Sequence, residues 1–115
     1  MLKKLADRKL VLQNELKGGE GIVSILHCFS NDEFSSKIRH CSTTIIPPGA
    51  SIGLHKHENE EEVYILIEGQ GILNDGKSKM KIEKGDVILT KSGESHSVIN
   101  SGKDDLKIIA VIVCY

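Results

Sequence analysis

The chain has 115 residues, and its 15 basic and 16 acidic side chains give a formal net charge of −1. This length predicts one domain, residues 1–115, whose core can form without disulfides. The balanced charge argues against binding of nucleic acid through a basic stripe or of an anionic membrane through a polybasic segment. Aromatic residues make up only 3% of the chain, so the core is expected to be aliphatic.

The three cysteines, Cys28, Cys41 and Cys114, show no motif spacing, and an odd number does not suggest a disulfide framework. We expect each of them to be a small buried hydrophobic residue. Residues 1–10 lack the apolar run of a signal peptide, and no stretch approaches the roughly 18 apolar residues of a membrane span. These features predict a cytoplasmic protein with reduced thiols.

Alternating apolar and polar residues, interrupted by turn-forming residues, dominate the chain from about Leu10 onward. Residues 1–20 are expected to form an N-terminal extension or strand, and only the first ten or so favour a helix. Residues 31–33 predict a turn or a short helical start, and Asn74-Asp75-Gly76 predicts a tight hairpin. The predicted strands are 22–27, 37–46, 62–68, 72–73, 79–82, 86–90, 96–99 and 106–114.

Many short strands at close spacing indicate an all-β fold, a barrel or a sandwich. Closing or doubling the sheet removes exposed strand edges on which copies of the chain would otherwise associate. The near-continuous apolar run 106–114 is expected to be a buried strand.

Histidines and carboxylates cluster in the middle of the chain, where His55 and His57 are followed by three glutamates, residues 60–62. On a strand, residues two apart point to the same face, so both imidazoles can meet one ion. Glu62 shares its strand face with Tyr64. If that face points into the fold, its carboxylate completes the site.

His96 lies much later in the chain and reaches the same ion only if the intervening hairpin folds back. The turn-forming residues 74–76 and 84–85 provide that reversal. Three imidazoles and a carboxylate suit Mn, Fe, Co, Ni, Cu or Zn, and they leave open positions on an octahedral ion. An isolated His-x-His pair is more often a surface feature, but this ordered set on a β framework favours a metal site.

Two segments resemble the sequence motifs of the cupin superfamily. Gly49, five residues, His55-Lys56-His57, four residues, Glu62, six residues and Gly69 match the first motif, residues 49–69. Gly85, five residues, Lys91-Ser92-Gly93, two residues, His96, three residues and Asn100 match the second, residues 85–100. The resemblance implies a small single-domain cupin, a double-stranded β-helix or jelly-roll barrel.

The resemblance also implies that His55, His57, Glu62 and His96 bind one divalent transition metal ion. Glu61 is an alternative carboxylate, and the six-residue distance to Gly69 favours Glu62. The family's usual proline is replaced by Lys91. Because proline would stiffen this turn, its absence is expected to loosen the approach to His96.

Two functions remain open at this point. The first is a metal-dependent enzyme of dioxygenase, decarboxylase or isomerase type that acts on a small polar organic molecule, with Tyr64, Glu61 and His40 as the few candidate acids or bases. The second is a non-catalytic barrel whose metal anchors a sugar or a carboxylate. The resemblance further implies a homodimer.

Overall fold

The computed structural model describes residues 1–115 and contains ten β-strands and three single turns of 3-10 helix. None of the helical turns is long and apolar enough to cross a membrane. The helical turns are η1 (Leu5–Asp7), η2 (Leu16–Gly18) and η3 (Asn31–Glu33). The strands are β1 (Leu10–Asn14), β2 (Ile22–His27), β3 (Ile38–Ile46), β4 (Ser51–Lys56), β5 (Glu60–Glu68), β6 (Gln70–Asn74), β7 (Lys79–Glu83), β8 (Val87–Thr90), β9 (Ser95–Ile99) and β10 (Leu106–Cys114).

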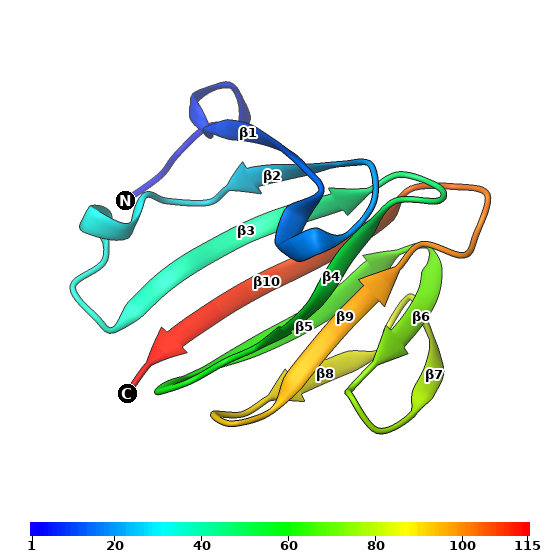
Figure 1. The fold of residues 1–115 in the computed structure, drawn as a ribbon. Helices are drawn as coiled ribbons and strands as arrows, with labels where there is room; N and C mark the ends of the chain where they lie inside the picture. The colour runs from blue at the N-terminus through cyan, green and yellow to red at the C-terminus, as the bar shows by residue number, and fades with distance from the viewer.

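The strands form two antiparallel sheets that pack face to face (Figure 1). One sheet has six strands in the order β1-β2-β3-β10-β5-β8, and the other has four in the order β4-β9-β6-β7. The last strand, β10, lies inside the larger sheet between β3 and β5. The predicted all-β fold, a small double-stranded β-helix or jelly-roll barrel, is confirmed.

The core lies between the two sheets, because alternate residues of each strand point inward. Along β10, Leu106, Ile108, Ala110 and Ile112 are buried, and the residues between them are not. Apart from Tyr64 the core is aliphatic, as the composition predicts. The core cluster contains Val23, Ile25, Ile46, Ala50, Ile52, Tyr64, Leu66, Leu73, Ile82, Val98, Leu106, Ile108 and Ala110.

The strand predictions agree with the structure, since β2 and β10 have the predicted bounds and the other predicted strands shift by at most two residues at an end. The helical turn η3 is also where the sequence indicates a turn or short helical start, whereas η2 was not predicted. The expectation for the cysteines was wrong, since all three are half-buried. Cys41 and Cys114 lie where β3 and β10 run beyond the buried part of the core, and Cys28 directly follows the end of β2.

Asn100 ties together the loops at one end of the fold, as the turn-forming role of asparagine suggests. It is 2% exposed. Its Nδ2 donates to the carbonyl oxygens of Ile46 (2.7 Å) and Asp104 (2.8 Å), and its Oδ1 accepts from the N–H of Gly102 (2.9 Å). The side chain therefore holds the chain between β9 and β10 against the end of β3.

Replacing Asn100 with alanine is expected to lower the free energy of unfolding by about 2 kcal/mol or more, because buried backbone groups lose their partners. Asn14→Ala, at an exposed position of β1, serves as the control and should change stability by less than about 0.5 kcal/mol. Urea denaturation of both variants with a chelator present measures the difference. Equal stabilities of the two variants would contradict the role of Asn100.

Candidate metal centre

Three histidines and one glutamate converge between the sheets, namely His55, His57, Glu62 and His96. Each contributes one imidazole nitrogen or carboxylate oxygen, and these four atoms lie within 4.8 Å of one another. His57, Glu62 and His96 are buried, and His55 is half-buried. The structure thus brings together the four residues named as ligands, and Glu61 is not a member of the group.

Strand pairing explains how residues so far apart in sequence meet. β4 and β9 are neighbours in the smaller sheet, and His55 lies directly opposite His96. Glu62 comes from β5 of the larger sheet, where it is paired with Thr90 of β8 and faces inward. The cluster therefore joins the two sheets from the inside.

His57 does not lie on a strand, contrary to the prediction, because β4 ends at Lys56. The register between β4 and β9 also shifts before His55, so simple alternation does not hold there. The N–H of His57 donates to the carbonyl oxygen of Glu94 (3.1 Å), and the N–H of Gly93 donates to that of His57 (2.7 Å). Hydrogen bonds to the β8–β9 turn, and not strand geometry alone, position this ring.

The histidines meet through their Nε2 atoms. The Nε2 of His96 lies 3.0 Å from that of His57 and 3.1 Å from that of His55. The Oε1 of Glu62 lies 3.1 Å from the Nε2 of His57 and 3.0 Å from that of His96. Four potential donor atoms therefore surround one point.

The outer ring nitrogens fix the orientation of the rings. The Nδ1–H of His55 donates to the carbonyl oxygen of Gly53 (2.7 Å), and that of His57 donates to Glu60 Oε2 (2.6 Å). Both acceptors lack a proton of their own, so the neutral rings carry their hydrogen on Nδ1 and turn a bare Nε2 toward the centre. This tautomer is the one that a metal ligand needs.

The sequence analysis missed the partners that hold these rings. Arg39 of β3 donates from Nε and Nη2 to the two carboxylate oxygens of Glu60, both at 2.6 Å. Glu60 in turn accepts from His57, and the Thr90 hydroxyl is hydrogen-bonded to His96 Nδ1 (2.8 Å). Glu60 belongs to the run of three glutamates of which only Glu61 and Glu62 were candidates, Arg39 lies outside both motifs, and Thr90 is an unspecified position of the second.

The electrostatics of the cluster favour an ionised carboxylate. Burial raises the pKa of Glu62, but in the metal-free site the hydrogen bonds with His57 and His96, which form when these rings carry a proton on Nε2, outweigh it and bring the pKa down to about 2. The hydrogen bond with Glu62 raises the pKa of His57, whereas burial lowers that of His55. An anionic oxygen and bare imidazole nitrogens form a donor set that suits a divalent transition metal ion.

Of the three candidate acids or bases, two lie at the site. The Tyr64 ring stacks on His96, with centroids 4.8 Å apart and planes at 13°. Burial raises the pKa of Tyr64 well above its usual value, so it can donate a proton or a hydrogen bond but is no base. Burial lowers the pKa of His40, whose Nε2 is hydrogen-bonded to Ser42 Oγ (2.8 Å). Glu61 does not line the cavity beside the cluster.

This cavity has a volume of about 230 Å³ and is lined by His55, His57 and Glu62 of the cluster. Its apolar wall consists of Leu16, Ile25, Ile52, Tyr64, Ala110 and Ile112. A larger hollow of about 420 Å³ lies between the β6–β7 hairpin and β8, but His96 is the only cluster residue that lines it. The smaller cavity is therefore the one through which a ligand would reach the cluster.

Lys91 does not loosen the turn before His96, which corrects the expectation drawn from the missing proline. The backbone N–H of Lys91 donates to Glu94 Oε1 (2.8 Å), and the N–H of Glu94 donates to the carbonyl oxygen of Lys91 (3.0 Å). Proline has no N–H and would not form the first of these bonds. The turn is closed by Glu94 instead.

Comparison with known sequences identifies relatives of this chain. The family model described as "Cupin domain" matches residues 42–112. A protein of Thermotoga maritima named "Oxalate-binding protein" is 42% identical over 100 residues, which cover 87% of this chain and 83% of that protein. The region before residue 42, which includes η2, lies outside the family match but largely within the similarity to the Thermotoga protein.

Comparison with solved structures points the same way. A crystal structure described as "a predicted oxalate decarboxylase" from Thermotoga maritima has a TM-score of 0.94 and 37% identity, with all of both chains covered. A cupin 2 conserved barrel domain protein from Salinispora arenicola has a TM-score of 0.73 and 23% identity, over 91% of this chain and 81% of that one. At 23% identity, the similarity to the Salinispora protein shows only a shared fold.

Proposed function

This chain belongs to the cupin family, and on that premise we propose that it holds one divalent metal ion and, through it, a small carboxylate ligand. The metal ligands are His55, His57, Glu62 and His96. The observation that carries the proposal is the convergence of bare imidazole nitrogens and an ionised carboxylate on one point. Oxalate is the first ligand to test, because one relative is named an oxalate-binding protein.

The donor set fits the ion that the family implies. Three imidazoles and one carboxylate suit Mn, Fe, Ni, Cu or Zn, and cellular supply decides among them. A bound ion would supply a Lewis acid with open positions for ligand oxygens. The chain's own residues orient the rings, exclude water with the apolar wall and leave one face of the cluster open to the cavity.

The cavity suits a small ligand better than a large one. Its volume of about 230 Å³ is below the roughly 300–1,000 Å³ typical of pockets for drug-sized molecules. The wall combines apolar side chains with Lys17, Arg39 and Lys56. A compact anion would fit the volume of this cavity and would complement the positive charge of its cationic residues.

Calorimetric titration of oxalate tests the proposal directly. Protein loaded with Mn²⁺ or Zn²⁺ is expected to bind about one oxalate per chain, and protein stripped with a chelator and dialysed should bind none. Failure of the protein to bind oxalate with any of the divalent ions it takes up would overturn the carboxylate part of the proposal.

A metal-dependent enzyme is the second candidate, and His40 favours it. This residue lines the cavity, and its lowered pKa leaves it neutral and able to accept a proton at pH 7. Incubation of the metal-loaded protein with oxalate and assay of formate separates the two functions. Formate production that His40→Gln abolishes, with oxalate binding retained, would establish catalysis, and binding without turnover would establish the non-catalytic barrel.

Glu60→Gln is expected to weaken metal affinity about 10–100-fold, the usual effect of losing the partner that orients a histidine ligand. The amide no longer stabilises the Nδ1–H of His57 as a carboxylate does, and Arg39 loses its partner. Competition with a chromogenic chelator measures the affinity. Glu58→Gln, at an exposed site two residues away, should leave it unchanged; equal affinities in both variants would remove Glu60 from the site.

Metal affinity is also expected to fall with pH. Because the hydrogen bond with Glu62 raises the pKa of His57, the metal-free ring begins to take up a proton at a pH above its usual 6.5. Metal must displace that proton, so affinity should decline about tenfold per pH unit below this pKa. Glu62, with a pKa of about 2, stays ionised and adds nothing to the slope above pH 5. Zn²⁺ titrations at pH 7.5 and 5.5 check this, and equal affinities would contradict a histidine ligand set.

A further inference from the structure

The helical turn η2 packs directly on the backbone of β4. The contact is at Gly53, two residues before His55. A Cβ added to Gly53 would collide with the carbonyl oxygen of Lys17, and one added to Gly19 with that of Ser51. The N–H of Ser51 donates to the carbonyl oxygen of Glu20 (2.9 Å), and the N–H of Glu20 donates to Ser51 Oγ (2.9 Å). Glycines at two positions thus let residues 15–20 pack as a strap across the strand.

Two residues of the strap adopt a backbone conformation that is unfavourable for residues with a side chain. Glu15 has φ 53° and ψ 47°, and Lys17 has φ 56° and ψ 29°, both in the left-handed region. For residues with a side chain this region costs about 1–2 kcal/mol each. Such strain is often found where a structure positions a ligand-binding group. Here it accompanies the placement of Lys17 on the wall of the cavity.

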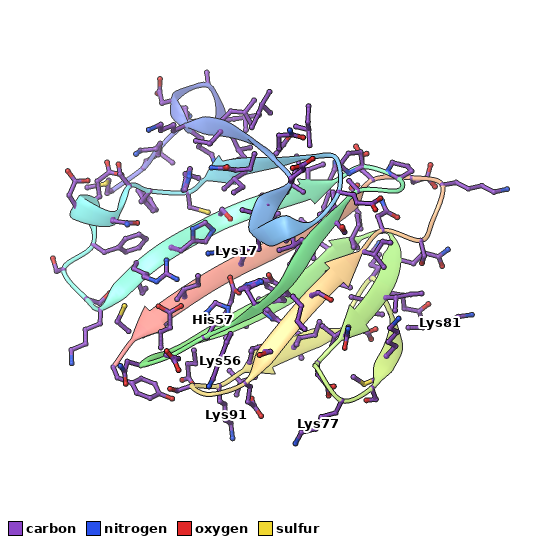
Figure 2. The ribbon with its side chains drawn as sticks, in the orientation of Figure 1. Lys17, Lys56, His57, Lys77, Lys81 and Lys91 are labelled. Atoms are coloured by element: carbon purple, nitrogen blue, oxygen red, sulfur yellow. The ribbon has the colours of Figure 1, made fainter.

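Lys17 differs from the other two cations of the cavity in having no anionic partner. Arg39 is paired with Glu60 (2.6 Å), and Lys56 with Glu58 (3.4 Å). Lys17 makes no ion pair although it lines the cavity with His57. Figure 2 shows Lys17 beside η2, in front of the larger sheet. An unpaired cationic residue on the wall of the cavity favours an anion there.

We propose that Lys17 binds the ligand through the negative charge that the metal does not neutralise, and that the strap thereby selects dianionic small acids over monoanionic ones. The inference rests on the proposed function. A divalent ion and the ionised Glu62 together leave one positive charge, and Lys17 adds a second. With Arg39 and Lys56 paired, a dianion such as a dicarboxylate matches the remaining charge.

Oxalate and glycolate test this selectivity, because both can chelate an ion through two oxygens but glycolate carries a single negative charge. Lys17→Gln is expected to lower oxalate affinity about tenfold, the loss of one charge-assisted hydrogen bond, and to leave glycolate and metal affinities unchanged. Lys81→Gln removes the same charge from β7, away from the cavity, and should change none of the three.

A second variant moves the strap without changing charge. Gly19→Ala is expected to displace η2 from Ser51 and to reduce the preference for oxalate over glycolate as Lys17→Gln does, with metal affinity retained. Oxalate binding that is equal in Lys17→Gln and Lys81→Gln, or a loss shared equally by glycolate, would overturn the role of Lys17. Absence of oxalate binding in the metal-loaded wild type would instead overturn the proposed function.

Discussion

His57→Ala is expected to lower the affinity for a divalent metal ion by more than about 100-fold, because even loss of an outer-shell partner costs about 10–100-fold. The substitution removes one of three Nε2 donors and also leaves the Glu60 carboxylate without its histidine partner. The buried Glu62 loses one of its two hydrogen-bonding histidines. The protein as purified is expected to contain about one metal ion per chain, and the variant none.

His27→Ala is the matched control. His27 lies on β2 and stacks edge-on with His40, at a centroid distance of 5.4 Å, but it does not belong to the cluster. Elemental analysis of untagged wild type and both variants, followed by metal titration, measures the effect. Equal losses of metal affinity in the two variants would contradict the ligand assignment. A wild-type protein that neither contains nor takes up metal would mean that it shares the fold of the family but not a metal site.

The sequence predicts the strands and the members of the cluster because both depend on local pattern. Runs of β-forming apolar residues predicted the bounds of β2 and β10, and motif spacing singled out His55, Glu62 and His96, which the structure brings together. Alternation failed at His57, where a register shift and hydrogen bonds to the β8–β9 turn replace strand geometry. A shift of this kind depends on the partner strand and leaves no mark in the local sequence.

The groups around the cluster could not be predicted in the same way. Arg39 meets Glu60 across 21 positions of the chain, and only the pairing of β3, β10 and β5 brings them together. The strap carrying Lys17 falls in residues 1–20, for which the sequence predicts only an N-terminal extension or strand. Two of its left-handed residues, Glu15 and Lys17, are not glycines, so the sequence does not reveal that Lys17 adopts this conformation.

Tyr64→Ala is expected to lower the free energy of unfolding by about 3–5 kcal/mol, the usual loss when a buried aromatic side chain is removed. Tyr64 is 4% exposed and lies opposite Ala110 on β10, so no large neighbour fills the space it leaves. Such a loss is a large part of the about 5–15 kcal/mol typical of a small protein. Tyr115→Ala, at a position 62% exposed, should cost less than about 0.5 kcal/mol.

Tyr64→Phe separates the ring of Tyr64 from its hydroxyl. The ring stacks on His96, so phenylalanine should retain metal affinity and stay within about 1.5 kcal/mol of the wild type. Urea denaturation without metal and metal titration of the folded variants measure both quantities. A Tyr64→Phe variant as unstable as Tyr64→Ala would show that the hydroxyl, and not the ring, stabilises the fold. If Tyr64→Phe keeps its metal but loses oxalate binding, the protonated hydroxyl contacts the ligand, as its raised pKa allows.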